Sequence, residues 1–242
     1  MIAQLVVLTL IGSSAAVPNR NLDVVAKMEH FEGVAYHDDG EIAYRETHEV
    51  ETRNGRLVRS LTTYFDPEGR LLGTLLSDYE QDPFAPNYEF KNETGQVVEG
   101  AELKKDGIRL FYKGQGRFLP FAGPREEGLM GGERFVLGQG LHQLARARID
   151  DLARGERLAV RFAIPSRFDS YVFRIEPIET RDANVLRLRI GIDNWILSLV
   201  APSIEVDYDR VRKRLLTYRG VSNLTNSEGE SMQVTIRYSY PT

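Results

Sequence analysis

The chain has 242 residues, of which 27% are charged, and a formal net charge of −4 at pH 7. It contains no cysteine, which excludes disulfides, a thiol nucleophile and thiolate metal sites. Because a mildly acidic chain has no general affinity for nucleic acid, we expect no nucleic-acid partner.

The N-terminal segment has the composition of an export signal. Residues 2–11 form an apolar run, and the small residues at 12–16 are those that a signal peptidase accepts before its cut. The run is too short to span a bilayer, which needs roughly 20 apolar residues. We therefore predict that residues 1–16 are a signal peptide and that the mature protein is periplasmic or secreted. The alternative is a buried N-terminal strand.

Residues 17–242 are predicted to form a single β-rich domain, because all-β domains of roughly 200–250 residues commonly fold as one unit. Near the start of this domain, Asn21 can cap a short helix over residues 21–28, with Leu22, Val25 and Ala26 on one side. We expect this helix to cover one end of a sheet.

Turn signals at nearly even spacing follow in the first half of the chain. They are Asp38-Asp39-Gly40, Asn54-Gly55, Asp66-Pro67-Glu68-Gly69, Thr94-Gly95 and Asp106-Gly107. Asp-Gly and Asn-Gly pairs tolerate the positive φ angles of tight hairpins, so the spacing predicts a meander of antiparallel strands. The predicted strands are 41–50, 57–65, 70–79, 96–103 and 108–113, with a wider loop around Pro83 and Pro86 and a long irregular loop over 114–132.

The second half begins with one amphipathic helix, predicted from about Phe135 to Leu152. Its apolar residues recur at intervals of three and four, at Leu137, Leu141, Leu144, Ala145, Ile149 and Leu152. Gly155 is placed to end the helix. Apolar and charged residues alternate after it, which predicts strands with one dry and one wet face at 158–164, 171–175, 186–192, 204–209, 214–218 and 233–240.

These elements predict a mainly β fold, namely a large, strongly curved antiparallel sheet or open barrel with one main amphipathic helix packed on or inside it. In this architecture the chain resembles exported bacterial β-rich proteins of the lipoprotein-carrier-like and lipocalin-like kinds. The resemblance covers most of residues 17–242 and includes no diagnostic motif. It implies an interior that accepts an apolar ligand.

Aromatic residues gather around the Gly- and Pro-rich loop, at Phe111, Tyr112, Phe118, Phe121 and Phe135. Aromatic side chains beside flexible backbone can form a lid over an apolar cavity, and they can equally anchor a well-packed loop. We take Phe111, Phe118, Phe121 and Phe135 as the candidate ligand-binding residues.

Histidines and carboxylates cluster at the start of the meander. His30, His37 and His48 lie close in the sequence, and both residue types are usual zinc ligands. The carboxylates among them are Asp38, Asp39, Glu41, Glu46 and Glu49. The rings converge only if the hairpin register brings them together, and a solvated acidic hairpin is the favoured interpretation. We therefore predict no metal site.

A second group of acids, Glu205, Asp207 and Asp209, alternates along one predicted strand and so projects from one face. Adjacent carboxylates can serve as an acid and base pair or hold calcium. On a wet sheet face, ion pairs with neighbouring arginines are the favoured interpretation. The candidate partners are Arg187, Arg210 and Arg212.

The remaining motifs are weak. Gly138-Gln139-Gly140 matches part of a dinucleotide fingerprint, but the third glycine and the βαβ context are lacking, so we interpret it as the start of the helix. Arg210, Arg212, Lys213, Arg214 and Arg219 could meet anionic headgroups or a carboxylate, although interleaved acids favour a solvated strand pair. No Gly-x-Ser-x-Gly, phosphate-loop or His-Glu-x-x-His motif occurs, and we predict no catalytic residue and no cofactor.

The pattern as a whole predicts an exported, non-enzymatic binding protein for an apolar or amphipathic small molecule, such as a lipid. One alternative is an enzyme that uses either the carboxylates at 205, 207 and 209 or a metal held by His37 and His48. Another is a structural or interaction protein of the cell envelope. We expect no membrane-spanning segment in the mature protein, because the wet faces of the predicted strands carry arginines.

Export gives the first testable prediction. We expect protein recovered from the periplasm or the medium to begin near Val17, because the small residues before it form the cleavage site. N-terminal sequencing after cell fractionation checks this. A chain that keeps Met1 and stays in the cytoplasm contradicts it.

Overall fold

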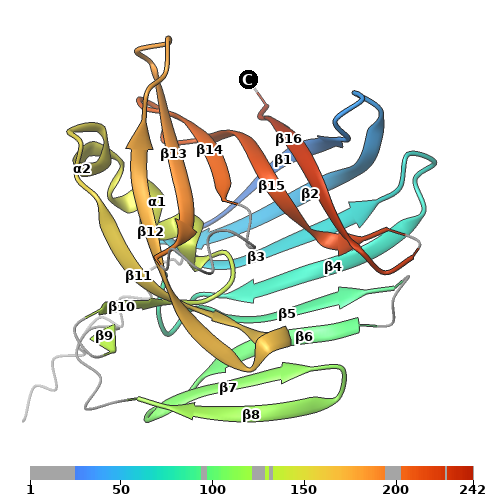
Figure 1. Ribbon diagram of the computed structural model, residues 1–242, viewed down its shortest axis with the longest axis vertical. Helices are drawn as coiled ribbons and strands as arrows, with labels where there is room; N and C mark the ends of the chain where they lie inside the picture. The colour runs from blue at the N-terminus through green and yellow to red at the C-terminus, as the bar shows by residue number, and fades with distance from the viewer. Residues whose placement is uncertain are drawn as a thin grey trace, which may run out of the picture.

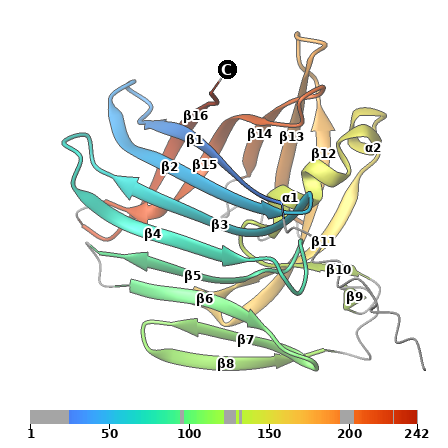
Figure 2. The ribbon, with the colours of Figure 1, turned by 180° about the vertical axis from the view of Figure 1, so that it is seen from behind.

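The computed structural model describes residues 25–93, 97–121, 129–130, 133–193, 203–226 and 228–241. They form one strongly curved sheet of 16 strands, with the order β8-β7-β6-β5-β4-β3-β2-β1-β16-β15-β14-β13-β12-β11-β10-β9. The two halves of the sheet face each other, and helix α1 lies between them (Figures 1 and 2). The predicted mainly β, open and curved architecture is therefore confirmed. The predicted signal peptide lies outside the described residues.

The first half of the sheet is the predicted meander. Its strands are β1 (Ala26–Tyr36), β2 (Ile42–Arg53), β3 (Arg56–Phe65), β4 (Leu71–Asp78), β5 (Asn87–Asn92), β6 (Val97–Leu103), β7 (Gly107–Tyr112) and β8 (Gln115–Pro120). Each strand pairs antiparallel with the next one in the chain, as short hairpin connections require.

The second half contains the helices. Its elements are β9 (Leu129–Met130), β10 (Glu133–Val136), α1 (Gly140–Ala147), α2 (Ile149–Ala153), β11 (Leu158–Ile164), the short 3₁₀ helix η1 (Pro165–Arg167), β12 (Asp169–Ile178), β13 (Val185–Ile192), β14 (Ile204–Asp209), β15 (Leu215–Thr225) and β16 (Ser231–Ser239). Strands β10 and β11 pair in parallel because α1 and α2 form the crossover between them. Antiparallel pairing of β16 with β1 joins the two halves.

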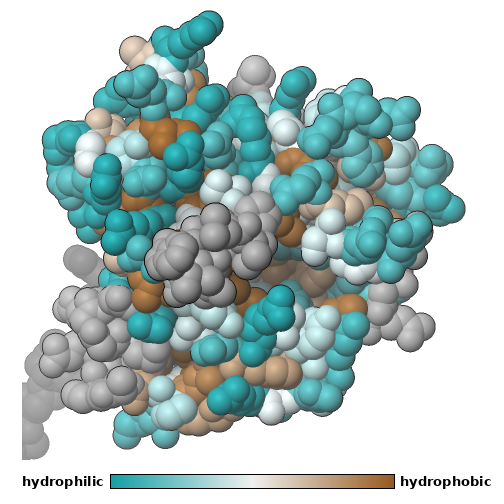
Figure 3. Space-filling model, viewed as in Figure 1, coloured by the Kyte–Doolittle hydropathy of each residue, from teal (hydrophilic) through white to brown (hydrophobic). Residues whose placement is uncertain are grey.

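Three clusters of buried apolar residues fill the inside of the curve. One packs α1 and α2, through residues such as Leu144 and Leu152, against β11 to β14. A second lies around Tyr64 and Ile236, where the first strands meet β15 and β16. The third holds Leu110 and Phe135 near the place where η1 contacts β6 and β7. In the view of Figure 3, hydrophilic residues cover the hairpin ends, and hydrophobic residues show mainly in the hollow between the two halves and toward the lower edge.

No helix among the described residues is long and apolar enough to cross a membrane.

Two helix predictions need correction. In the described part of the predicted helix over 21–28, Ala26 and Met28 belong to β1 and pair with Arg53 and Glu51. A ladder of hydrogen bonds to β2 thus outweighs a weak local helix preference. The main helix is confirmed, but it starts later than predicted, because Phe135 and Val136 belong to β10.

The strand predictions are confirmed, but five of the strands that the structure describes were not predicted. These are β1, β5 beside the predicted Pro83 and Pro86 loop, β8 and β9 inside the predicted loop over 114–132, and β10. Strand β8 is exposed along most of its length. It therefore lacks the apolar alternation by which strands are recognised in a sequence.

Helix packing gives the second prediction. Leu144 is 5% exposed and belongs to the cluster beneath α1 and α2. The Leu144→Asp substitution would bury an unpaired charge, so we expect the free energy of unfolding to fall by about 3–5 kcal/mol. Urea denaturation measures this change. The matched control is Ala147→Asp at the exposed end of α1, and a Leu144→Asp protein as stable as this control contradicts the packing.

Candidate functional site

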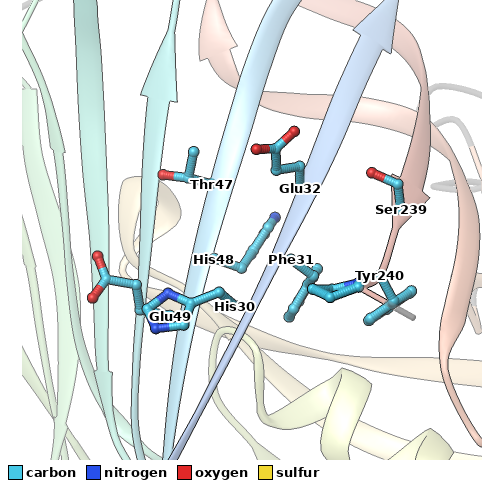
Figure 4. A pocket seen from close by; sticks show the side chains of 9 residues that line it. His30, Phe31, Glu32, Thr47, His48, Glu49, Ser239 and Tyr240 are labelled. Atoms are coloured by element: carbon cyan, nitrogen blue, oxygen red, sulfur yellow. The ribbon is translucent and has the colours of Figure 1, made fainter.

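A pocket lies where β16 ends beside β1 (Figure 4). Ser239, the last residue of β16, is opposite Glu32 of β1. Among the described residues, the earlier part of β1, from Ala26 to Phe31, pairs only with β2. The step between the long and the short strand leaves a pocket of about 380 Å³.

The lining of the pocket combines residues from both faces of the sheet. It consists of His30, Phe31, Glu32, Thr47, His48, Glu49, Ser239, Tyr240 and Pro241. Successive residues of a strand point to opposite faces. Gly33 and Glu46 face each other inside the curve, so Phe31 and His48 are on the inner face, while His30, Glu32, Thr47 and Glu49 are on the outer face.

Three rings stack on the inner side of the pocket. The Phe31 ring lies 4.3 Å from the His48 ring and 4.7 Å from the Tyr240 ring, measured between centroids. The Tyr240 hydroxyl donates a hydrogen bond of 2.9 Å to the Leu215 carbonyl oxygen, and the Arg214 guanidinium lies 4.6 Å from the Tyr240 ring centroid. These contacts fix the stack across the step in the sheet.

Behind the stack, His48 is held through both ring nitrogens. Its Nε2 lies 2.9 Å from Glu46 Oε2, and its Nδ1 lies 3.0 Å from Thr62 Oγ1. An ionised carboxylate can only accept hydrogen bonds. His48 Nε2 therefore donates to Glu46, and in the neutral ring Nδ1 accepts from the Thr62 hydroxyl.

Gln139 continues this chain of hydrogen bonds to the helix. Its Nε2 donates to Thr62 Oγ1 at 3.1 Å. Its Oε1 accepts from Ser60 Oγ at 2.8 Å and from Tyr79 OH at 3.3 Å. Gln139 is the residue immediately before α1, so the interpretation of Gly138-Gln139-Gly140 as the start of the helix is confirmed. The chain ties α1 to β2, β3 and the end of β4.

Glycines make room for this arrangement at two places. A Cβ at Gly33 would lie 3.0 Å from both Glu46 Oε2 and a Tyr238 ring carbon, so a side chain there would crowd the buried carboxylate. A Cβ at Gly140 would lie 1.9 Å from the Phe84 carbonyl oxygen. Glycine therefore allows the start of α1 to approach the loop before β5.

Tyrosines surround the Glu46 carboxylate. Burial first, and then the negative charge of Glu46, raise the pKa of Tyr44, Tyr64 and Tyr238 above the ordinary value for a phenol. These hydroxyls therefore remain protonated at neutral pH, as hydrogen-bonding groups without charge.

The order carboxylate, imidazole and hydroxyl matches that of nucleophile triads. However, Thr62 is only 1% exposed, and its hydroxyl contacts both His48 and Gln139. A nucleophile must reach the substrate, and the Thr62 hydroxyl is enclosed. The hydrogen bonds from Glu46 to Gln139 therefore hold His48 and the wall of the pocket in place.

The remaining histidine, His142, also lies inside. Its Nδ1 is 2.8 Å from the Tyr208 hydroxyl, and the two rings stack. Burial, with smaller contributions from Arg146 and His48, lowers the pKa of His142 to about 3. The His142 ring therefore carries no charge near pH 7.

The four predicted ligand-binding phenylalanines divide between the two faces of the sheet. Phe135 is 2% exposed in the third cluster, and the Phe121 ring packs against it at 6.4 Å. Phe111 follows the buried Leu110, and Phe118 precedes the inward-packed Leu119. Phe111 and Phe118 therefore point to the outer face, and the structure does not bring the four rings together.

The three histidines that cluster in the sequence are not brought together in the structure. His37 lies in the turn between β1 and β2, His30 faces outward, and His48 is bound inside to Glu46. The described part of the chain contains no group of three or more His, Asp or Glu side chains placed to hold a metal ion.

The acids of β14 form ion pairs, as the favoured interpretation predicted. Arg187 Nε lies 2.6 Å from Asp207 Oδ1, and Arg219 Nη1 lies 3.0 Å from Asp207 Oδ2. Burial alone would raise the pKa of Asp207, but the hydrogen bonds from Arg187 and Arg219 lower it below its ordinary value. Backbone N–H groups, first that of Arg212, lower the pKa of Asp209. The surroundings of Asp207 and Asp209 therefore both favour the ionised carboxylate.

The sequence pattern does not mark Thr62, Gln139 and Tyr240 as site residues, and it predicts Glu46 only as part of an acidic hairpin. One signal was present, because Glu46 alternates with Tyr44 and His48 and so falls on the apolar, inward side of its strand. A charged residue at such a position is rare unless it is paired. The partners themselves are distant in the sequence.

Neither the protein-family models nor the curated proteins contain a match to this chain. Among solved structures, the fold is similar to a beta-barrel-like protein of the domain of unknown function DUF1849 from Brucella abortus. The similarity has a TM-score of 0.46 and 8% sequence identity, and it covers 90% of this chain and 98% of that one.

The hydrogen-bond chain gives the third prediction. Gln139→Leu keeps much of the side-chain volume but removes the hydrogen bonds that Thr62, Ser60 and Tyr79 make with Gln139. We therefore expect the free energy of unfolding to fall by about 1–3 kcal/mol. Urea denaturation measures the change, with Gln115→Leu on the exposed strand β8 as control. If both variants are equally stable, the hydrogen bonds of Gln139 do not stabilise the position of α1.

Proposed function

We propose that the protein is a non-enzymatic binding protein that takes a small amphipathic molecule into the pocket at the end of β16. The pocket itself carries this proposal. Its volume of about 380 Å³ lies within the range of small-molecule sites. Rings and hydrocarbon from Phe31, Tyr240 and Pro241 lie beside polar groups from His30, Glu32, Thr47 and Glu49, which suits a ligand with an apolar and a polar part.

The rigidity of the wall supports the proposal. His48 is fixed by Glu46 and Thr62, and the Phe31 ring is sandwiched between His48 and Tyr240. A preformed site loses little conformational entropy when a ligand binds, so more of the contact energy is available for affinity. The buried hydrogen-bonded residues Glu46, His48 and Thr62 thus contribute to ligand binding by keeping the wall of the pocket rigid, and this role requires no catalytic step.

The non-enzymatic part of the proposal rests on the reactive groups. The hydroxyl of Thr62 is enclosed, and Asp207 is held by two arginines. Such groups position and stabilise their neighbours. In this proposal the titratable groups of the pocket, His30, Glu32 and Glu49, recognise the polar part of the ligand.

The cellular location is part of the same proposal. We place the protein in the periplasm or outside the cell, because its first residues have the composition of an export signal. A pocket on the outer surface of the sheet suits the capture of a molecule from such a compartment.

The fourth prediction concerns a bound small molecule and is tested by native mass spectrometry of the gently purified protein. We expect an adduct with the mass of a small molecule on the wild-type chain. Ser239→Trp should remove it, because an indole at this lining position fills the pocket. The matched control is Ser231→Trp, an exposed serine at the other end of β16 on the same outer face, which should keep the adduct.

Two results would overturn this proposal. One is a wild-type protein free of any adduct that also fails to bind small molecules added to it. The other is an adduct that Ser239→Trp retains as well as Ser231→Trp does. Either result favours a structural or interaction role in the cell envelope.

A further inference from the structure

We infer that the molecule bound in this pocket is an organic cation, such as a protonated amine with a short apolar group. This inference rests on the proposed binding function and adds the charge of the ligand. It follows from the charges of the lining residues and from their positions on two neighbouring strands.

The lining has an excess of negative charge. Glu32 and Glu49 are its carboxylates, and no lysine or arginine lines the pocket. His48 is already bound to Glu46 and Thr62. An anionic ligand such as a fatty acid would meet like charges in this pocket, whereas a cation would meet opposite ones.

Glu32 and Glu49 differ from the other outward glutamates of the sheet. Glu51 lies 2.8 Å from Arg53, Glu89 lies 2.7 Å from Lys91, and Glu102 lies 2.7 Å from Lys104. Within the described part of the chain, neither Glu32 nor Glu49 has an ion-pair partner. Among the outward glutamates of the strands that the structure describes, the two without an ion pair are thus those that line the pocket.

The strand register places these carboxylates around one point. Glu32 of β1 is opposite Thr47 of β2, and His30 is opposite Glu49. The four side chains therefore form the corners of a patch on the outer face, with the carboxylates on one diagonal and the Thr47 hydroxyl and His30 ring on the other (Figure 4). An ammonium group at the centre can donate a hydrogen bond to more than one corner.

The apolar part of the ligand has a place beside this patch. Phe31, Tyr240 and Pro241 line the same pocket. Both faces of the Phe31 ring are occupied by His48 and Tyr240, so the ring edge and Pro241 offer hydrocarbon contact. The cation is therefore recognised by the carboxylates, and the hydrocarbon by the aromatic residues.

A bare metal ion fits these residues less well than an amine does. The His, Asp and Glu side chains of the described residues include no group of three that could hold a metal. An organic cation also uses the apolar half of the pocket, which a metal ion leaves empty.

The test compares three probes that share a phenyl ring and differ in charge: 2-phenylethylamine, 2-phenylethanol and 3-phenylpropanoate. Isothermal titration calorimetry on the full mature chain measures their affinities. We expect the amine to bind at least about tenfold more tightly than the alcohol, and the acid not to bind, because the carboxylates discriminate by charge. Added salt should weaken the binding of the amine and leave that of the alcohol unchanged.

Variants of the two glutamates then test whether these residues cause the preference for the amine. Glu32→Gln and Glu49→Gln should each weaken amine binding by about five- to tenfold and leave alcohol binding unchanged, because each removes one charge and little volume. Glu41→Gln, at an exposed position before β2 and outside the pocket, should bind as the wild type does. Thermal melting confirms that each variant is folded.

The outcomes separate this inference from the proposed function. Failure of the amine to bind, amine binding no tighter than alcohol binding, or amine binding unaffected by both glutamate variants overturns the cation inference. The binding function stands if the native adduct still depends on Ser239. Zinc that displaces the amine and requires both glutamates would assign the patch to a metal and likewise overturn the inference.

Discussion

A buried charge must be paired and hydrogen-bonded, and the inside of this protein is organised around that requirement. Glu46 points into the curve of the sheet, where it is 4% exposed. His48 pairs with it, Thr62 holds His48, and Gln139 connects Thr62 to the start of α1. Gly33 leaves the space that the carboxylate needs. The hydrogen bonds that satisfy this charge thus also hold the His48 ring in the wall of the pocket and link the start of α1 to β2 and β3.

A difference in strand length creates the pocket itself. Strand β1 continues beyond the last residue of β16, so the sheet has a step at the strand pair that joins its two halves. The stack of His48, Phe31 and Tyr240 fills the inner side of the step. The outer side remains open, with Glu32 and Glu49 at its edge. A site at this joint has contributions from β1, β2 and the end of β16.

Some carboxylates of this sheet are ion-paired and stabilise the fold, whereas others are unpaired and line the pocket. Asp207 is neutralised by Arg187 and Arg219, and its lowered pKa reflects a carboxylate that serves the folded state. Glu32 and Glu49 lack such partners among the described residues and line a cavity. Unpaired charge beside an apolar surface is a more informative sign of a binding site than the aromatic residues alone, because aromatic residues also fill cores.

Local patterns in the sequence determined the elements of this fold. Asp-Gly and Asn-Gly turns set the hairpins of the first half, the spacing of Leu144 and Leu152 set the helix, and alternation set the later strands. These signals depend on residues within a few positions of each other. Strand β8 was missed because an exposed edge strand carries no such signal.

Only the tertiary structure decided the site. Glu46 is linked to Gln139 through His48 and Thr62, and Phe31 stacks on Tyr240. Strand register and the closing of one half of the sheet upon the other bring these residues together. Register follows from the hydrogen-bond ladders and from the packing of the whole sheet, so residues distant in the sequence show no shared pattern. The four candidate phenylalanines cluster in the sequence but divide between the two faces of the sheet, because the sheet and not the sequence distance decides which side chains are neighbours.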